Sequence, residues 1–398
     1  FFALFIITII KIRKGITMKK LSLFVFIDGF GWEVYKKHGF NVKNIKNAKP
    51  LKTTFGFSSA ADPSILTGRY PDEHTHWSSF YYDPKNSPFK FFHYLSFLPK
   101  RIFDRFRPRH YLSKLIKLFY GFTGYFELYS VPFKYLPYFD YLEKRDYFVP
   151  NGILKTDTIF DWCVKHDIPY HCSNWRKSET YNINALKKEI LKKEIEFTYL
   201  YLPTLDGVMH TYGTKEVQTK NKLQWLEKQI EEVHSLAKEH YEEVSLHIFS
   251  DHGMCDTKGS VDLIASIEKT NLEYGKDYVA MYDSTMARFW FLNDEAKVKI
   301  QEVLESTKEG SIVSHDELKK MRVFFEGNRF GEMFFLTHPG ILINPSYFGL
   351  KAIPGMHGFH PDHKDSNALM FSSTVIDENI QSITDIRKVM EKEIRNEN

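Results

Sequence analysis

The sequence contains little cysteine, with three residues in 398, at Cys163, Cys172 and Cys255. An odd number of cysteines without the close spacing of a metal-binding motif does not support a disulfide framework. Few and unpaired cysteines are typical of proteins in a reducing compartment. We therefore expect a cytoplasmic protein.

The sequence also lacks an apolar run long enough to cross a membrane. Residues 1–10 are almost wholly apolar, but a membrane-spanning helix needs about 20 such residues. No basic residue precedes this run, as one would in a clear signal peptide. Because Met18 opens a segment with the pattern of a strand, we expect the natural start there, with residues 1–17 upstream of it or disordered.

Strong net charge is missing as well. The formal net charge is +4 and no zinc-finger or RNA-binding signature is present, so no nucleic-acid partner is expected. Aromatic residues, in contrast, are plentiful, and between residues 80 and 145 they alternate with twelve Lys or Arg against five Asp or Glu. This stretch is either a cap over a pocket or a patch that contacts anionic lipid at the membrane surface.

Three apolar runs have the length of buried strands: 21–27, 197–202 and 244–249. Between the second and third, apolar residues recur at spacings of three and four from Leu223 to Ala237, which predicts an amphipathic helix. Strand, helix and strand in succession predict an α/β fold, with a doubly wound, mostly parallel sheet and helices on both faces. We expect one catalytic domain over residues 18–398, with insertions at about 78–150 and about 260–345.

Ionisable residues follow each of the three predicted strands. Because ligands of open parallel sheets bind beyond the carboxyl ends of the strands, we expect these side chains to converge. Each motif alone is also found in ordinary turns and helix caps, but together with a histidine between glycines near the C-terminus they form a set of six nitrogen or oxygen donors. The set is Asp28, Asp206, His210, Asp251, His252 and His357. Six donors suffice for two sites of three ligands, and paired metals suit in-line displacement at phosphorus.

The stretch GFSSAADPSILTG, residues 56–68, is small and polar and contains two adjacent serines, Ser58 and Ser59. A helix that begins near the serines would direct free backbone amides at a bound phosphate. Asp62 followed by Pro63 is itself a helix-start signature, so the sequence leaves open whether the helix begins there instead.

Five segments, FIDGFGW, GFSSAADPSILTGRYPDEH, YLPTLDGVMHTYG, FSDHGM and GMHGFHP, together resemble the alkaline phosphatase superfamily, most closely its nucleotide pyrophosphatase/phosphodiesterase branch. The resemblance implies a phosphoric ester hydrolase that depends on two divalent metal ions, zinc or alternatively manganese, with no further cofactor. It implies that Asp206, His210 and His357 hold one ion. The other would be held by Asp28, Asp251 and His252.

The resemblance also assigns a nucleophile. In this branch it lies nine residues before the Thr of a Thr-Gly pair, and counting back from Thr67 gives Ser58, which would form a phosphoryl-serine intermediate. The backbone amide of Ser59 would face the phosphate. The substrate implied is a small-molecule or lipid-linked phosphate ester.

Some residues depart from the family pattern. Ala61 stands where nucleotide phosphodiesterases are expected to carry a phosphate-binding Asn, which weakens the case for a nucleotide substrate. Sulfate ester cleavage is disfavoured because the sulfatase nucleophile pattern is absent, and a phosphoglycerate mutase fits less well. The alternatives are a phosphotransferase of phosphoethanolamine or phosphoglycerol, and a non-catalytic protein of the same fold that binds phosphorylated glycans or lipids.

Overall fold

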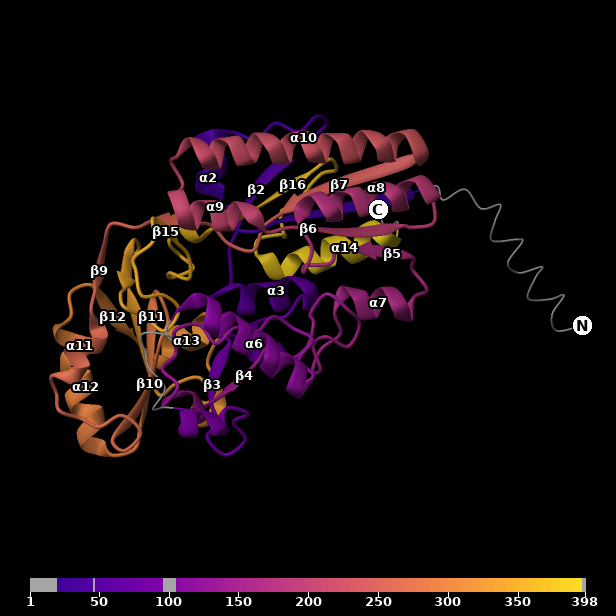
Figure 1. Ribbon diagram of the computed structural model, residues 1–398. Helices are drawn as coiled ribbons and strands as arrows, with labels where there is room; N and C mark the ends of the chain where they lie inside the picture. The colour runs from indigo at the N-terminus through magenta and orange to yellow at the C-terminus, as the bar shows by residue number, and fades with distance from the viewer. Residues whose placement is uncertain (1–19, 46, 96–104, 396–398) are drawn as a thin grey trace, which may run out of the picture.

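The fold is built on a central six-stranded sheet (Figure 1). The computed structural model describes residues 20–45, 47–95 and 105–395. The strands lie in the order β2, β16, β7, β1, β6, β5, with these bounds: β1 Lys20–Ile27, β2 Asn47–Leu51, β5 Tyr170–Cys172, β6 Phe197–Leu202, β7 Glu243–Phe249 and β16 Ala368–Ser372. β1 pairs in parallel with β6 and β7, and β5 in parallel with β6, whereas β16 is antiparallel to its neighbours β7 and β2. The predicted α/β fold with a mostly parallel sheet is confirmed.

Helices cover both faces of this sheet. On one face lie α8 (Glu179–Lys192), α9 (Thr204–Tyr212) and α10 (Val217–His240), and on the other α3 (Ser58–Thr67), α7 (Ile159–Lys165) and α14 (Ile386–Arg395). Side chains alternate along a strand, so Val25 of β1 packs in the first layer and Phe24 and Phe26 in the second. Burial on both faces explains why β1 is apolar throughout.

The three strands and the helix expected from the apolar pattern are present as β1, β6, β7 and α10. β6 and β7 are parallel but are not neighbours, because β1 lies between them. The carboxyl ends of all three therefore meet at one edge of the sheet. The chain segments that leave this edge carry the ionisable residues singled out in the sequence.

A second, antiparallel sheet lies apart from the first (Figure 1), with the strand order β10, β11, β13, β12. Its strands are β10 Tyr278–Tyr282, β11 Met286–Phe291, β12 Gly310–Val313 and β13 Met333–Thr337, and its helices are α11 Leu263–Glu268, α12 Asp294–Ser306 and α13 His315–Lys320. These elements fall within the insertion expected at about 260–345.

The aromatic stretch that follows residue 78 packs against this second sheet. It contains the paired strands β3 (Phe80–Tyr82) and β4 (Phe139–Tyr141), the helix α6 (Phe106–Tyr120) and the 3-10 turns η1 (Lys90–Leu95) and η2 (Leu136–Tyr138). Phe89 and Phe92 share one apolar cluster with Phe289 and Trp290 of β11. Much of the aromatic excess thus forms a core common to the two expected insertions. The division of the chain into a domain and insertions stays a prediction, and residues 96–104 lie outside the described residues.

Short elements complete the chain: α2 Trp32–His38, α4 Pro71–His74, β8 Cys255–Asp256, β9 Gly259–Val261, η3 Glu326–Asn328, β14 Ile341–Ile343, β15 Gly355–Met356, η4 Lys364–Ser366 and η5 Ile383–Asp385. Within the described residues, none of the helices combines the length and the apolar character needed to span a bilayer. The expected start at Met18 and the proposal for residues 1–17 concern a segment outside the described residues.

Candidate active site

Asp28, Asp251 and His252 form the first of two Asp/His groups at the carboxyl edge of the sheet. Asp28 directly follows β1, and Asp251 and His252 come just after β7, which pairs with β1. One potential ligand atom of each lies within 4.8 Å of the others. His252 Nε2 is 2.9 Å from Asp251 Oδ2 and 3.8 Å from Asp28 Oδ1. The three side chains are buried, and their potential ligand atoms converge on one point.

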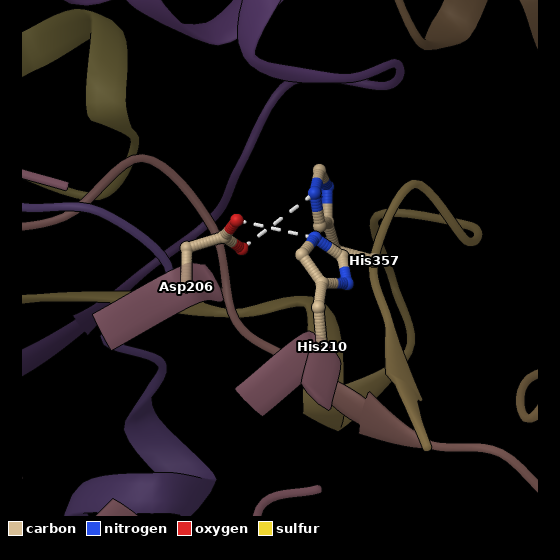
Figure 2. Close-up of side chains that lie close together, drawn as sticks. All are labelled: Asp206, His210 and His357. Carbon is tan, nitrogen blue, oxygen red and sulfur yellow. Dashed lines mark ion pairs between the residues drawn. The ribbon is translucent and has the colours of Figure 1, made fainter. Parts of the chain in front are cut away.

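Asp206, His210 and His357 form the second group (Figure 2), again with ligand atoms within 4.8 Å of one another. Asp206 and His210 lie one turn apart on α9, and His210 Nε2 is 3.1 Å from Asp206 Oδ2. His357 comes from the loop after β15, and its Nε2 is 3.7 Å from Asp206 Oδ1. Because α9 is a helix, the spacing of four residues places Asp206 and His210 on the same side of it.

The two groups are neighbours. The rings of His252 and His357 are stacked with their centroids 3.7 Å apart, so each group contributes one histidine to a shared contact. Gly29, at a φ of 72°, permits the close approach of β1 to α9, because a Cβ atom there would lie 3.1 Å from Asp206 Cβ. All six residues that the sequence suggested as ligands are thus brought together.

Backbone carbonyls orient two of the histidines. His210 Nδ1 donates to the carbonyl of Gly355 at 2.8 Å, and His252 Nδ1 donates to the carbonyl of Gly253 at 2.9 Å. Because a carbonyl only accepts, each ring carries a proton on Nδ1, so in the neutral imidazole Nε2 is the electron-pair donor toward its group. This is the usual arrangement of histidines that coordinate a metal.

The first group has the unsatisfied donors that a cation would require. Asp28 Oδ1, Asp251 Oδ2 and His252 Nε2 are buried, and beyond the contact of 2.9 Å between His252 and Asp251 they have no hydrogen-bond partner among the described residues. Such atoms are rare in folded proteins because an unpaired buried polar group is costly. In the second group, Asp206 Oδ1 is likewise buried and has no hydrogen-bond partner among the described residues. Carboxylate and imidazole donors of this kind suit zinc and related divalent ions.

The acidic residues of the two groups perturb one another. Burial, together with the charges of Asp251 and Asp206, raises the pKa of the Asp28 carboxyl well above its usual range. For His252, burial opposes protonation, but the charge and close contact of Asp251, the charge of Asp206 and the bond to the Gly253 carbonyl together outweigh burial and raise the pKa to about 9. Both shifts show a site where negative charge is crowded, which a bound cation would relieve.

Ser58 is the first residue of α3, so the helix begins at the serines. The carbonyl of Phe57 accepts from the amides of Ala60 and Ala61 at 2.8 and 3.1 Å, which closes the first turn there. The alternative start at Asp62 and Pro63 is wrong, because Pro63 lies inside the helix. The first amides of a helix have no carbonyl partner within it and can bind an anion.

The two serines differ in their surroundings. The hydroxyl of Ser59 donates to the carbonyl of Trp77 at 3.0 Å and is buried. The hydroxyl of Ser58 is half-buried and, within the described part of the chain, makes no hydrogen bond. Gly358, at a φ of 84°, brings the loop of His357 against Phe57, since a Cβ there would lie 2.5 Å from the Phe57 ring. The start of α3 and the second group are thus held in contact.

A cavity of about 500 Å³ opens beside these residues. Ser58, Ser59 and four of the six Asp/His residues line it: Asp28, Asp206, His210 and His357. Ala61 does not line it but packs in the apolar core, so the missing Asn at this position carries no information about phosphate binding. The sequence-based argument against nucleotides from Ala61 is not supported by its location.

Further residues of the cavity could not be found from the sequence. Asp62, Ser78, Ser79 and Glu143 line it. Several aromatic rings also line it: Tyr125, Tyr129 and Tyr147 from the first expected insertion, and Trp175 and Phe348 from outside the insertions. Tyr201 is an exception, because it lies near the carboxyl end of the strand predicted at 197–202, where the sequence analysis expected the site. Its hydroxyl donates to Asp28 Oδ2 at 3.1 Å.

A mostly parallel α/β sheet with two Asp/His groups at the carboxyl ends of its strands, beside a helix that begins with a serine, places the protein in the alkaline phosphatase superfamily. Within it, the chain belongs to the type I phosphodiesterase/nucleotide pyrophosphatase family, whose model matches residues 22–360. Members of this family are hydrolases that typically bind two metal ions.

Three solved structures share the fold. Murine ectonucleotide pyrophosphatase/phosphodiesterase 5 has 13% sequence identity and a TM-score of 0.65. An inactive variant of it in complex with AMP has 14% identity and a TM-score of 0.65, and the human protein of the same name has 12% and 0.64. In each case 95% of both chains is covered. No curated protein matches the chain by sequence.

Proposed function

We propose that the chain is a two-metal-dependent phosphoric ester hydrolase of the phosphodiesterase/pyrophosphatase type that acts through a phosphoryl-Ser58 intermediate. The observation that carries the proposal is that Ser58, at the start of α3, and residues of both Asp/His groups line the same cavity. Family membership supports the reaction class. A cavity of about 500 Å³ is suited to a small-molecule or lipid-linked phosphate ester.

In this proposal one metal ion is held by Asp28, Asp251 and His252. The other is held by Asp206, His210 and His357. Zinc is the ion we propose, with manganese as the alternative, because the donors are carboxylates and imidazoles. When bound, such ions supply the positive charge that lowers the pKa of the serine hydroxyl and of water and that neutralises phosphoryl oxygens.

Ser58 performs the first displacement. The Ser58 hydroxyl releases its proton to solvent, its oxygen attacks phosphorus, and a Ser58 O–P bond forms. The bond from phosphorus to the leaving alcohol breaks, and the alcohol takes a proton from solvent. The amide of Ser59, in the first turn of α3, donates to a phosphoryl oxygen, and the positive end of the helix dipole acts in the same sense. The hydroxyl of Ser59 donates to the carbonyl of Trp77 and takes no part in the reaction.

Water performs the second displacement. It attacks the phosphorus of phosphoryl-Ser58, the Ser58 O–P bond breaks, and the serine regains its proton. Two successive in-line displacements each invert the phosphorus centre, so the reaction proceeds with net retention at phosphorus. We further propose a cytoplasmic location, in keeping with the three free cysteines.

The test is a panel of phosphomonoesters, phosphodiesters and one sulfate ester, assayed with the full chain in Zn²⁺ or Mn²⁺. We expect cleavage of phosphate esters, diesters above all, and none of the sulfate ester. Ser58→Ala should abolish turnover but keep the metal content, whereas Ser59→Ala, the matched control, should retain turnover because only its amide is used. Full activity of Ser58→Ala would refute the mechanism.

A further inference from the structure

The outer face of α6 is apolar, the reverse of an ordinary surface helix. Four residues at spacings of three and four lie on this face and are 63 to 83% exposed: Tyr111, Leu115, Leu118 and Phe119. The opposite face carries Ser113 and Ile116, which are buried. Surface helices normally direct their polar residues outward, so these four side chains lack an explanation in the folding of the chain itself.

The charges of α6 are all of one sign. The helix contains no Asp or Glu, and Arg107 and Lys114 are exposed at one flank of the apolar face. Within the described residues, neither makes an ion pair. An apolar strip of aliphatic and aromatic residues flanked by unpaired basic residues is complementary to a surface that is both negatively charged and apolar beneath. An anionic lipid bilayer has these two properties.

The helix is fixed firmly to the protein through its inner face. The guanidinium group of Arg109 donates to the carbonyls of Tyr129 and Val131 at 3.0 and 2.7 Å. The hydroxyl of Ser113 accepts from the amide of Leu128 at 3.0 Å. The orientation of the apolar face toward solvent is therefore held by specific bonds and does not result from loose packing.

The segment beneath α6 leads to the cavity. It is the segment to which Arg109 and Ser113 are bonded, and two of its tyrosines, Tyr125 and Tyr129, line the cavity that contains Ser58. Tyr125 is also 44% exposed, so it reaches from the cavity to the surface. A lipid surface in contact with α6 would thus lie beside the outer wall of the cavity.

We propose that the outer face of α6 docks on an anionic lipid bilayer, with Leu115, Leu118 and Phe119 inserted among the lipids and Arg107 and Lys114 at the head groups. With 15 residues, α6 is shorter than a membrane-spanning helix and lies in the plane of the interface. Docking brings membrane phosphate esters to the mouth of the cavity. The delivery of membrane phosphate esters to the cavity rests on the proposed function, whereas the docking of α6 does not.

Sedimentation with vesicles tests the docking. The full chain is mixed with vesicles of phosphatidylcholine containing about one third phosphatidylserine, and with pure phosphatidylcholine, at about 0.05 and about 0.5 M salt. We expect it to pellet with the anionic vesicles at low salt and less at high salt. Leu118→Glu combined with Phe119→Glu should weaken binding roughly tenfold or more, because two apolar side chains leave the lipid and two negative charges enter.

Matched controls separate docking from general surface effects. Leu191→Glu with Val298→Glu introduces the same charges at exposed apolar residues of α8 and α12, and should bind like the unchanged protein. Arg107→Gln with Lys114→Gln should reduce both the affinity and its salt dependence. All variants should keep the thermal midpoint, because the altered side chains are exposed. Equal binding by the α6 double variant, or no binding by the unchanged protein, would overturn the proposal.

The same vesicles distinguish docking from catalysis. Ser58→Ala should pellet as well as the unchanged protein, since Ser58 is not one of the lipid-facing side chains. The α6 double variant should hydrolyse a soluble phosphate ester normally and a vesicle-embedded one slowly. Normal pelleting of the unchanged protein without any esterase activity would refute the proposed function and support the docking. Esterase activity without pelleting would refute the docking and support the proposed function.

Discussion

Glu143 offers a quantitative test of the cavity. It is buried at the cavity wall, where the hydroxyl of Ser79 donates to Glu143 Oε1 at 2.9 Å. Burial raises the pKa of its carboxyl to about 7, although the bond from Ser79 and the charge of Lys117 act in the opposite direction. The perturbation we choose is Glu143→Gln, which keeps the shape and a hydrogen-bond acceptor but removes the titration.

The sign follows from the two states of the protein. The unfolded chain releases the Glu143 proton near pH 4.5, whereas the folded protein keeps it up to about pH 7. Between these values the folded state binds more protons, so the free energy of unfolding falls as the pH rises and levels off above pH 7. At about 1.4 kcal/mol per pH unit, the carboxylate costs about 3 kcal/mol of stability at pH 8.

Urea denaturation of the unchanged protein and of Glu143→Gln, from pH 4.5 to 8, measures this cost. The difference in free energy of unfolding should grow by about 3 kcal/mol in favour of the Gln variant across this range, because only the unchanged protein must bury a charge. Glu302→Gln, at an exposed residue of α12, is the control and should show no such trend. A difference for Glu143→Gln that stays constant with pH would refute the argument that this side chain is desolvated.

Three further predictions concern the site and its support. Asp206→Asn should lower both the metal content, measured by elemental analysis, and the turnover, while unchanged metal content would contradict the ligand role. Tyr201→Phe removes the donor to Asp28 Oδ2 and should lower the metal affinity roughly tenfold, as seen by titration with a competing chelator; equal affinity would show that the bond does not orient Asp28. Arg288→Met leaves Asp283 buried without its partner at 3.0 Å and should cost about 3 to 5 kcal/mol in urea denaturation, and a loss below about 1 kcal/mol would be inconsistent with that burial.

Local spacing determined the features that the sequence could predict. β1, β6 and β7 are apolar because strands covered on both faces admit few polar side chains, and their polar ends mark where the chain leaves the sheet. The separation of four residues between Asp206 and His210 places both on one side of any helix. These relations hold within a few residues of the chain and need no knowledge of the rest of the fold. The family resemblance then grouped the six donors.

Local residue spacing could not predict contacts between segments that are distant in the sequence. That β1 lies between β6 and β7, and that His357 stacks on His252, depend on strand order and on loops more than a hundred residues apart. The start of α3 at Ser58 had a competing signal at Pro63, and the closing of the first turn on the Phe57 carbonyl resolved it. Local propensity was ambiguous there because both starts are sterically allowed.

The sequence by itself therefore determined the class of fold and supplied the candidate donors, since these depend on short-range periodicity and chemistry, whereas the prediction of Ser58 as nucleophile came from the family resemblance. The tertiary structure decided the surroundings of these residues. The raised pKa of Glu143 exists only because the folded chain buries this carboxyl, and the amphipathic pattern of α6 does not reveal that its apolar strip faces outward. Whether a side chain is buried depends on which segments pack over it in the folded molecule. Residues that are neighbours in the sequence do not specify those segments.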